Sequence, residues 1–348
     1  MAELTVFGGG SWGTALAASA AKSGRQVCLW CRRSEQARAI NALGRNPDYL
    51  GDIPLPPGVT ATPDPEEAAL ASRMWILALP TQNLRKFLAV LSPFFTAGIE
   101  ICNVAKGMEI ETGRRISQIV EEVIPGAPYS ILSGPSFAEE VARGLPTAVT
   151  VASSRESSAL LWQSMLNSQR LRLYTSGDVA GTETGGAVKN IMAIASGLAS
   201  SLGLGDNARA ALVCRGLAEI QRFGACLGAH PLTLAGLAGM GDLVLTCYSM
   251  KSRNFRLGAA LGRGLSLEGA RAEIGQVAEG AYTVKAVVGE AKRLSVDMPI
   301  SEGIWRLLYG GASPGEELER LLSRDPKPEY PPGAFWGAGS CPGKKTDV

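Results

Sequence analysis

Residues 4–13 have the sequence LTVFGGGSWG, in which an apolar run leads directly into three glycines. The apolar run is typical of a buried strand, and the stretch TALAASAAKSG that follows is typical of a helix of small residues ending at Gly24. A second apolar run occupies residues 26–30. A strand, a glycine turn, a helix and a strand within about 30 residues predict a dinucleotide-binding unit.

Three glycines of this turn, Gly8, Gly10 and Gly13, fit the pattern G-x-G-x-x-G. Gly8 permits the tight turn, Gly10 lets the backbone approach a pyrophosphate, and Gly13 lets the helix pack closely on the strand. The N-terminus of the helix then offers unpaired N–H groups and a partial positive charge to the phosphates. The alternative is a glycine-rich turn in another kind of α/β protein, because a chain with 42 glycines produces this pattern easily.

Composition narrows the class of protein. A length of 348 residues is sufficient for two domains, and a hydrophobic content of 46% is sufficient for large cores. The formal net charge is +2 without a long run of one sign, which argues against a nucleic-acid or acidic-membrane partner but leaves a local basic site open.

The sequence predicts neither a targeting segment nor a membrane span. Met1 leads almost at once into the first predicted strand, so we expect no signal peptide. Residues 191–204 are too few and too rich in Gly and Ser to span a bilayer, and we expect a buried helix.

The seven cysteines are scattered and odd in number, which favours reduced thiols and a cytoplasmic protein. Cys28 and Cys31 form C-x-x-C, a pattern found in redox and zinc sites. Both lie on the predicted second strand, and no second cysteine pair or histidine cluster completes a site. We therefore expect core or strand-end thiols and no metal.

The first half of the chain alternates strands with helices. Apolar runs suited to buried parallel strands occur at residues 74–79, 100–104, 129–132 and 148–152, with helical segments such as 84–91 and 113–123 between them. Five prolines between residues 54 and 65 indicate a loop-rich connection. The alternation predicts an α/β fold over residues 1–176, with a Rossmann-like, doubly wound and mostly parallel sheet that has helices on both faces.

After about Ser176, strand-like runs become rare and helical patterns rich in Ala, Leu and Gly replace them. They occupy residues 185–202, 207–227, 232–237, 253–261, 266–274, 283–294 and 301–309. We expect a C-terminal all-α domain over residues 177–324 that binds the substrate. Residues 325–348 are rich in Pro, Gly and Lys, show no periodicity and are expected to form a flexible tail.

The second strand ends in CRRS, where NAD-specific units carry an acidic residue for the ribose 2′-OH. A guanidinium suits a 2′-phosphate, so we hypothesise that NADPH is accepted and can be the preferred coenzyme. One alternative is that Arg32 and Arg33 are solvated loop charges. Another is that Glu35, two residues further along, still contacts a ribose.

Hydride transfer to a carbonyl requires a proton donor beside the developing alkoxide. The single histidine, His230, precedes Pro231 at an apparent helix boundary and is expected in a loop. Lys189 lies in the stretch TGGAVKN, which we expect at the start of a long apolar helix just past the domain boundary. In an interdomain cleft, burial and neighbouring positive charge would lower its pKa, whereas spacing alone favours a solvated surface lysine.

Other polar segments carry residues of the same kind. Lys106 follows a predicted strand at the edge where ligands bind in doubly wound sheets, and SGPSFA at residues 133–138 opens a predicted helix after another strand. Each of these is also consistent with a tight turn and a cap. In the helical region, Asp242 could orient a lysine. Ser252 can cap a helix whose Arg253 and first N–H groups form an anion site.

Together these motifs resemble the NAD(P)-dependent glycerol-3-phosphate dehydrogenase family of the bacterial type. The similar stretches follow the family's order over roughly residues 4–310: GGGSWGTALA, LWCRR, VAKGME, SGPSFAEEV, GGAVKNIMAI, NARAALVCRGLAEI, GMGDLVLTC, SRNFRLG and GQVAEG. GGAVKN together with GDLVLTC and SRN is far more specific than the glycine turn.

The resemblance implies a role for each matching residue. Lys189 occupies the position of the family's proton donor and acceptor, with Lys106 and Asp242 as its catalytic neighbours. The residues implied to contact the cofactor are Gly8, Gly10, Ser11, Trp12, Gly13, Arg32, Arg33, Lys106, Ala138, Arg253, Val277 and Glu279. Those implied to surround the substrate are Lys106, Gly134, Ser136, Lys189, Asp242, Ser252, Arg253 and Asn254.

The implied reaction is the reversible reduction of dihydroxyacetone phosphate to sn-glycerol 3-phosphate with NADPH or NADH. The resemblance further implies a homodimer that supplies glycerophospholipid synthesis. The nearest alternative is another lysine-using dehydrogenase of two domains, such as a 3-hydroxyacid dehydrogenase, against which the SRN phosphate site argues. An alternative of a different class is a nucleotide-sensing module without catalysis, which has no need of acid–base residues.

Overall fold

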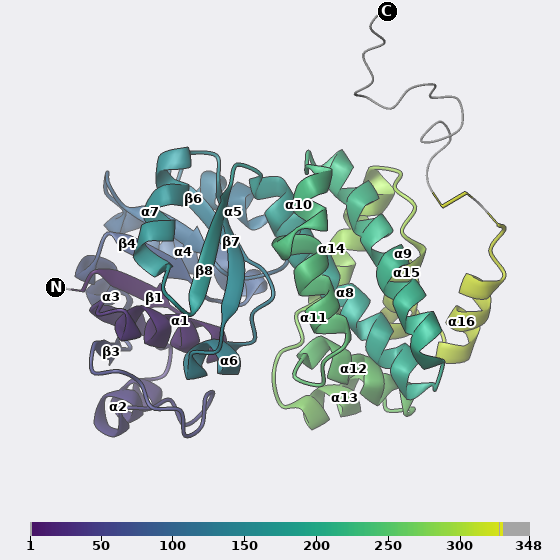
Figure 1. The fold of residues 1–348 in the computed structure, drawn as a ribbon, viewed down its shortest axis with the longest axis horizontal. Helices are drawn as coiled ribbons and strands as arrows, with labels where there is room; N and C mark the ends of the chain where they lie inside the picture. Colours follow the sequence, from purple (N-terminus) through teal and green to yellow (C-terminus); the bar gives the residue numbers. More distant parts are fainter. Residues whose placement is uncertain (1, 327, 330–348) are drawn as a thin grey trace, which may run out of the picture.

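The computed structural model describes residues 2–326, 328 and 329, and Figure 1 shows a sheet region beside a helical region. Within the described residues, eight strands form one sheet in the order β3-β2-β1-β4-β5-β6-β7-β8. The strands are β1 (Leu4–Phe7), β2 (Val27–Trp30), β3 (Val59–Thr62), β4 (Met74–Leu77), β5 (Glu100–Asn103), β6 (Tyr129–Ser133), β7 (Thr147–Ser153) and β8 (Leu171–Ser176). Strands β1 to β6 are mutually parallel, β7 is antiparallel to β6, and β8 is parallel to β7. This confirms the predicted mostly parallel sheet.

Helices connect the strands and then fill the second region. In the sheet region they are α1 (Ser11–Lys22), α2 (Ser34–Leu43), α3 (Pro65–Ala71), α4 (Thr81–Leu91), η1 (Ser92–Phe94), α5 (Ile116–Val123), α6 (Ala138–Arg143) and α7 (Glu156–Leu166). In the helical region they are α8 (Val179–Ser201), α9 (Gly205–Cys226), α10 (Pro231–Ala235), the π-helical turn η2 (Leu237–Gly241), α11 (Asp242–Cys247), α12 (Arg253–Gly262), α13 (Leu267–Ile274), α14 (Gly280–Arg293), α15 (Pro299–Tyr309) and α16 (Pro314–Leu322).

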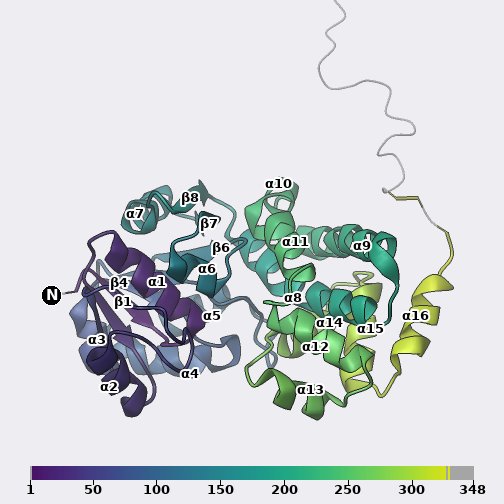
Figure 2. The same ribbon diagram turned by 60° about the horizontal axis from the view of Figure 1, so that its bottom comes forward.

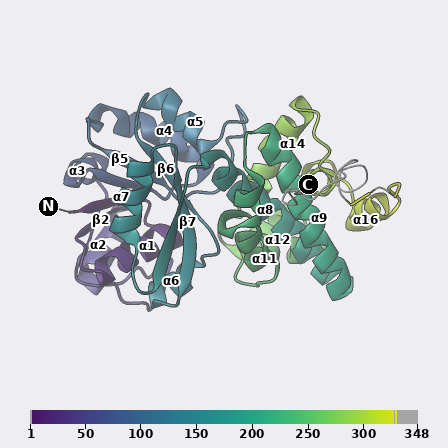
Figure 3. The same cartoon turned by 45° about the horizontal axis from the view of Figure 1, so that its top comes forward.

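Each face of the sheet has its own apolar core, because alternate residues of a strand point to opposite faces. Leu4 and Val6 of β1 pack with α1 and α7 on one face. Phe7 of the same strand packs with α3, α4 and α5 on the other face. Figures 2 and 3 show these two helical layers on either side of the strands.

Helix α8 is the central element of the helical region (Figure 1) and is buried from Gly181 to Ala199. Helices α9, α11, α12 and α14 pack around it. Two glycines permit its close crossing with α12. A Cβ atom at Gly258 would lie 1.9 Å from the carbonyl oxygen of Ile194, and one at Gly197 would lie 2.0 Å from that of Phe255.

The sequence did not predict strands β3 and β8. Strand β3 lies inside the proline-rich stretch expected to be a loop, and Pro65 of that stretch begins α3. Strand β8 carries the exposed side chains of Arg172 and Tyr174, so it lacks a continuous apolar run. Both strands lie at the edges of the sheet, where one face or one side is less covered.

The thiols predicted for the core are where the sequence placed them. The six described cysteines are free, and Cys28 is buried within β2 while Cys31 is buried directly after it. Burial raises the pKa of the Cys28 thiol to about 11 and that of the Cys31 thiol to about 12, so neither is reactive at neutral pH. Cys341 and most of the predicted tail lie outside the described residues.

Among residues 2–326, 328 and 329, no group of three or more His, Cys, Asp and Glu side chains could hold a metal ion. No helix within these residues has the length and apolarity needed to cross a membrane.

The crossing of α8 and α12 generates a stability prediction. We expect Gly258→Ala to lower the free energy of unfolding by about 1–3 kcal/mol, because the added methyl group collides with the backbone of α8. Gly289→Ala, on the exposed side of α14 with no atom within 4 Å of the added carbon, is the control. It should leave stability unchanged or raise it by up to about 1 kcal/mol. Denaturant unfolding measures both, and equal stability of the two variants would contradict the close crossing.

Candidate active site

One carboxylate, that of Asp242, lies between two ammonium groups. Its Oδ1 accepts a hydrogen bond from Lys189 Nζ at 2.8 Å, and its Oδ2 accepts one from Lys106 Nζ at 2.5 Å. The exposed fractions of the three side chains are 2% for Asp242, 8% for Lys189 and 16% for Lys106. Lys106 belongs to the sheet region, whereas the other two belong to the helical region, so this cluster joins the regions.

The ends of two neighbouring strands place Lys106. The residue follows β5, and its Nζ also donates to the carbonyl oxygen of Gly134 at 3.1 Å, just after β6. Gly134 has φ +147°, and a Cβ there would lie 2.9 Å from the Cα of Val149, so the turn requires glycine. Ligands of doubly wound sheets bind at this carboxyl edge of the strands.

Two glycines bring α8 against this edge. A Cβ at Gly186 would lie 2.9 Å from Ser133 Oγ and 3.4 Å from Lys106 Cγ. A Cβ at Gly185 would lie 2.6 Å from the carbonyl oxygen of Ala238 in the π-helical turn η2. Helix α8 therefore contacts both the end of β6 and the turn that leads into Asp242.

Each lysine retains one free N–H after its contacts within the protein. Lys189 Nζ donates to Thr246 Oγ1 at 2.8 Å as well as to Asp242. Lys106 Nζ donates to Asp242 and to Gly134. Because an ammonium has three donors, each lysine has one left for a ligand.

Burial is the largest influence on Lys189 and lowers its pKa to about 8, because the ammonium is poorly solvated there. The positive charge of Lys106 lowers the pKa further, while Asp242 acts to raise it. For Asp242, burial acts to raise the pKa, but attraction to Lys106 and Lys189 outweighs burial and holds the pKa below its ordinary value. With both lysines protonated, two ammonium groups share one carboxylate, and the resulting single positive charge suits an anionic ligand.

One expectation about Lys189 is wrong: the residue does not lie at the start of a helix, since α8 begins at Val179 and Lys189 is in its interior. The alternative of a solvated surface lysine, which spacing alone favoured, is also wrong, because the side chain is buried. The segment 179–184 is polar and contains a glycine, yet it is helical and buried from Gly181 onward, where α8 contacts β6, β7, α10 and η2.

The N-terminus of α12 lies beside the same helix. Ser252 is the predicted cap, and its Oγ accepts a hydrogen bond from the N–H of Phe255 at 3.2 Å. Asn254 is buried and donates to Asn190 Oδ1 at 2.9 Å. Because Asn190 is the neighbour of Lys189, this bond fixes the start of α12 relative to the lysine.

Asn254 also accepts a hydrogen bond from the N–H of Gly280 at 2.9 Å, which brings the start of α14 to the same place. Glu279 precedes that glycine, and burial raises its pKa to about 7, although the charge of Arg253 acts to lower it. Arg253 itself is exposed. The predicted residues Ser252, Arg253, Asn254 and Glu279 thus belong to one corner of the helical region.

The three glycines of the first turn have the geometry that the predicted roles require. Gly8 has φ +130°, and a Cβ there would lie 2.3 Å from the carbonyl oxygen of Ala78. A Cβ at Gly13 would lie 2.0 Å from the carbonyl oxygen of Gly8. The space in front of Gly10 is open, with no atom within 4 Å of a Cβ position.

This turn fits the pyrophosphate of a dinucleotide. Gly10 is the N-cap of α1, and no side chain bonds to the first N–H groups of that helix. The indole N–H of Trp12 is buried without a hydrogen-bond partner. Gln36 and Asn46 donate to the carbonyl oxygen of Gly9 at 2.6 and 2.9 Å and so fix the turn. Open space at Gly10 and unpaired backbone N–H groups at the start of α1 are what an anion requires.

The end of β2 is basic and open to solvent. Arg33 is the N-cap residue of α2 and forms an ion pair with Asp48, and their side chains are 50% and 42% exposed. Arg32 is exposed next to it, and Ser11 donates to the carbonyl oxygen of Tyr49 at 3.4 Å. A 2′-phosphate at this edge would compete with Asp48 for Arg33.

The remaining predicted residues lie on three other segments of the chain. Ser136 Oγ donates to the carbonyl oxygen of Gly134 at 3.0 Å, and Ala138 is the first residue of α6. Val277 is 44% exposed in the segment before α14. His230 is exposed at the start of α10, where its Nδ1 accepts from the N–H of Leu232, in agreement with the loop position predicted for it.

Sequence reasoning missed four residues that complete these contacts. Thr246 lies four positions after Asp242, the spacing that places two side chains on one helix face, and this signal could have found it. Asn190 lies beside Lys189 in a motif already identified. Gln36 and Asn46 are 27 and 37 positions from Gly9, so no local pattern connects them to it.

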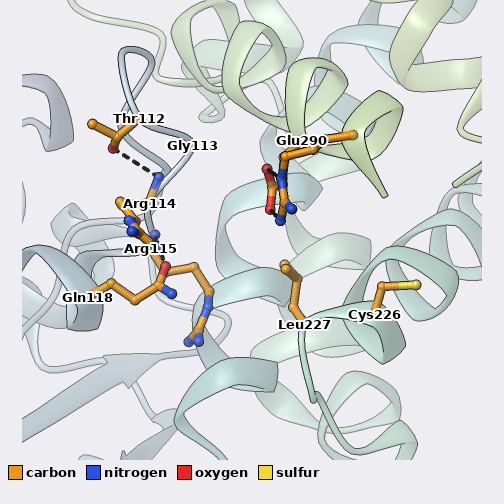
Figure 4. Close-up of a pocket in the computed structure, with 9 residues that line it drawn as sticks. Thr112, Gly113, Arg114, Arg115, Gln118, Cys226, Leu227 and Glu290 are labelled. Carbon is orange, nitrogen blue, oxygen red and sulfur yellow. Dashed lines mark hydrogen bonds and ion pairs between the residues drawn. The ribbon is translucent and has the colours of Figure 1, made fainter. Parts of the chain in front are cut away.

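A separate pocket of about 480 Å³ lies between the two regions, away from these residues (Figure 4). Its lining comes from the loop and helix at residues 112–118, the end of α9, and α14. Its arginines are already paired with carboxylates: Arg114 with Glu122, Arg115 with Glu183 and Arg293 with Glu290. We assign this pocket no part in the reaction.

Two models of one protein family match most of the chain. Residues 3–159 match the family described as the NAD-dependent glycerol-3-phosphate dehydrogenase N-terminus, and residues 178–319 match its C-terminus.

Named relatives agree with this match. The chain is 47% identical over 328 residues to a glycerol-3-phosphate dehydrogenase (NAD(P)+) of Thioalkalivibrio sulfidiphilus, covering 94% of the chain and 98% of that protein. It is 48% identical over 322 residues to the protein of the same name from Rhodospirillum rubrum, covering 92% of each. The crystal structure of a glycerol-3-phosphate dehydrogenase from Coxiella burnetii matches with a TM-score of 0.90 and 37% identity, over 93% of this chain and 99% of that one.

Proposed function

The chain belongs to the NAD-dependent glycerol-3-phosphate dehydrogenase family, and we propose that Lys189, Lys106 and Asp242 carry out its reaction. The enzyme reduces dihydroxyacetone phosphate to glycerol 3-phosphate with NADPH or NADH, and the reaction is reversible. The observation that carries the proposal is the carboxylate of Asp242 shared by two ammonium groups, each with one N–H left for a ligand.

Lys189 is the general acid of the reduction in this proposal. The chemistry that NADPH or NADH supplies when bound is a hydride for the carbonyl carbon. The free N–H of Lys189 donates its proton to the carbonyl oxygen, which becomes the hydroxyl group, and the neutral amine regains a proton from solvent. A pKa near 8 suits this role because the ammonium is present at neutral pH and still releases its proton readily.

Lys106 stabilises the negative charge that develops on the same oxygen with its own free N–H. Asp242 holds both ammonium groups in place through its two oxygens. The substrate phosphate binds at the N-terminus of α12 with Arg253. Binding of this remote group fixes the carbonyl beside the lysines.

The glycine turn holds the coenzyme in this proposal. Gly8, Gly10 and Gly13 and the first N–H groups of α1 receive the pyrophosphate, because that helix end is uncapped. Residues proposed to contact other parts of the coenzyme are Ser11, Trp12, Arg32, Arg33, Lys106, Ala138, Arg253, Val277 and Glu279. Gly134, Ser136, Ser252 and Asn254 complete the proposed substrate site.

We make four further proposals. The change of sequence pattern after Ser176 supports a division between a dinucleotide-binding domain and a substrate-binding domain at residues 176 and 177, directly after β8. The resemblance of the motifs supports a homodimer and a product that supplies glycerophospholipid synthesis. The scattered cysteines, odd in number, support a location in the cytoplasm.

Lys189→Ala tests the role of the general acid. We expect kcat for dihydroxyacetone phosphate reduction to fall about 10²–10⁴-fold, because no other group replaces the proton donor. The variant should still bind NADPH, as measured by the fluorescence of the coenzyme. Lys86→Ala, at an exposed position on α4, is the control and should keep wild-type activity. A loss smaller than threefold in Lys189→Ala would exclude this role.

The pKa of Lys189 gives a pH dependence. The ammonium form donates the proton in reduction, so kcat/KM for reduction should fall as pH rises through about 8. The neutral amine accepts the proton in the reverse direction, so kcat/KM for glycerol 3-phosphate oxidation should rise through the same pH. Steady-state rates between pH 6 and 10.5 measure both profiles. Midpoints near 10.5, the ordinary lysine value, would contradict the buried environment.

The basic end of β2 gives a prediction about the coenzyme. In Arg33→Ala we expect the ratio of kcat/KM with NADPH to that with NADH to fall about tenfold, since a charged hydrogen bond to the 2′-phosphate is lost. Arg38→Ala, on the same helix with a side chain 75% exposed, should leave the ratio unchanged. An unchanged ratio in Arg33→Ala removes this role for Arg33.

A further inference from the structure

A second buried carboxylate, that of Glu183, connects the two regions at a point outside the lysine cluster. Glu183 lies on α8, is 3% exposed, and precedes Lys189 by six residues. Its Oε1 accepts hydrogen bonds from the N–H of Ser117 and from Tyr129 OH, both at 2.7 Å. Its Oε2 accepts from Ser117 Oγ at 2.7 Å and from Arg115 Nη1 at 2.8 Å.

All four donors come from the sheet region. Arg115 and Ser117 lie at the start of α5, and Tyr129 is the first residue of β6. Both oxygens are therefore fully used, and the carboxylate has no remaining capacity that would suit a ligand. A buried carboxylate is costly without such partners, so the four bonds strongly favour one placement of α8.

This contact and the contact of Gly186 with Ser133 hold α8 along the same strand. Glu183 is bonded to the first residue of β6, whereas Gly186 contacts Ser133, the last residue of β6. Two contacts at opposite ends of one strand fix both the position of the helix along the strand and its rotation about its own axis. Lys189 is one turn beyond the second contact on the same helix.

The position of α8 along β6 determines how close Lys189 lies to Lys106 in the sheet region. Asp242, Thr246 and Lys189 all belong to the helical region and move together, whereas Lys106 and Gly134 belong to the sheet region. A shift of α8 along β6 would therefore separate Lys189 from Lys106 while leaving its bond to Asp242 intact.

We propose that Glu183 is a positioning residue for the reaction: its four bonds to Arg115, Ser117 and Tyr129 fix α8 on β6 and thereby place Lys189 opposite Lys106 and Gly134. This inference rests on the proposed function of Lys189. It assigns Glu183 no contact with substrate or coenzyme.

The principal test is Glu183→Gln, which keeps the size of the side chain but removes its charge and half of its accepting capacity. We expect kcat for reduction to fall about 10–100-fold, because misplacement of reacting groups by about 1 Å has effects of this size. The dissociation constant of NADPH should change less than twofold. A loss of kcat below twofold in the folded variant would overturn the proposal.

The pH profile separates positioning from a general loss of stability. The groups that face Lys189 are Asp242, Lys106 and Cys247, and of these only Lys106 lies in the sheet region. When Lys106 recedes, repulsion of the Lys189 ammonium weakens, so the midpoint of kcat/KM should move upward by roughly half a pH unit or more. An unmoved midpoint together with an unchanged kcat would show that Glu183 has only a structural role.

Glu219 offers a matched control. This carboxylate is 1% exposed and accepts three hydrogen bonds from Ile300 and Ser301, entirely within the helical region. Glu219→Gln should lower the melting temperature but leave kcat and the pH midpoint of the folded enzyme unchanged. If Glu219→Gln and Glu183→Gln reduced kcat equally, the effect would be one of stability and the proposal would fail.

Two further measurements keep the test decisive if Glu183→Gln does not fold. Tyr129→Phe removes a single donor and should lower kcat about 3–10-fold, less than Glu183→Gln does, because three of the four hydrogen bonds to the carboxylate remain. Hydrogen exchange without ligands should be faster at residues 183–190 in Tyr129→Phe than in the wild type. Unchanged exchange and unchanged kcat would overturn the proposal. If Lys189→Ala retained activity, the proposed function itself would fail, whereas an inactive Lys189→Ala beside an unaffected Glu183→Gln would remove only the positioning role.

Discussion

The placement of one carboxylate between two ammonium groups is the interaction on which the site depends. Asp242 bonds to Lys189 from its own region and to Lys106 from the other, so a single side chain both orients the two cations and joins the regions. Without this carboxylate, the ammonium groups of Lys106 and Lys189 would face each other with little solvation, and their repulsion would strongly destabilise the site. With it, the cluster keeps one positive charge and two free N–H groups, which suit an oxygen that becomes negative during reaction.

Glycines make this arrangement possible because they let the backbone of α8 lie close to neighbouring elements. Gly185 and Gly186 let α8 touch the end of β6 and the turn before Asp242, where any larger residue would collide. Gly197 and Gly258 let the same helix cross α12, whose capped N-terminus is the proposed phosphate site. These glycines, which belong to the helical patterns rich in Ala, Leu and Gly, therefore act at contacts between elements, and α8 takes part in each of these contacts.

Sequence patterns predicted what is decided locally. The turn at Gly8 and the cap at Ser252 follow from short patterns, and the structure has both. The mostly parallel sheet follows from the alternation of apolar runs with helical segments. The burial of Lys189 was not predictable from its sequence neighbours, because the residues to which it is hydrogen-bonded, Asp242 and Thr246, lie 53 and 57 positions away. The edge strand β8 was missed because the exposed residues Arg172 and Tyr174 interrupt the continuous apolar run that is typical of a buried parallel strand. The pairing of Gln36 with Gly9 was missed for the same reason as Lys189, since only the folded chain brings them together.

A crystal structure of the enzyme with glycerol 3-phosphate and oxidised coenzyme would test the central claim most directly. The account predicts that Lys189 Nζ keeps its bond to Asp242 and lies about 2.6–3.2 Å from the oxygen on C2 of the substrate, with Lys106 Nζ bonded to the same oxygen. It would be contradicted by a complex in which that oxygen contacts neither lysine, or in which Lys189 leaves Asp242 and points to solvent.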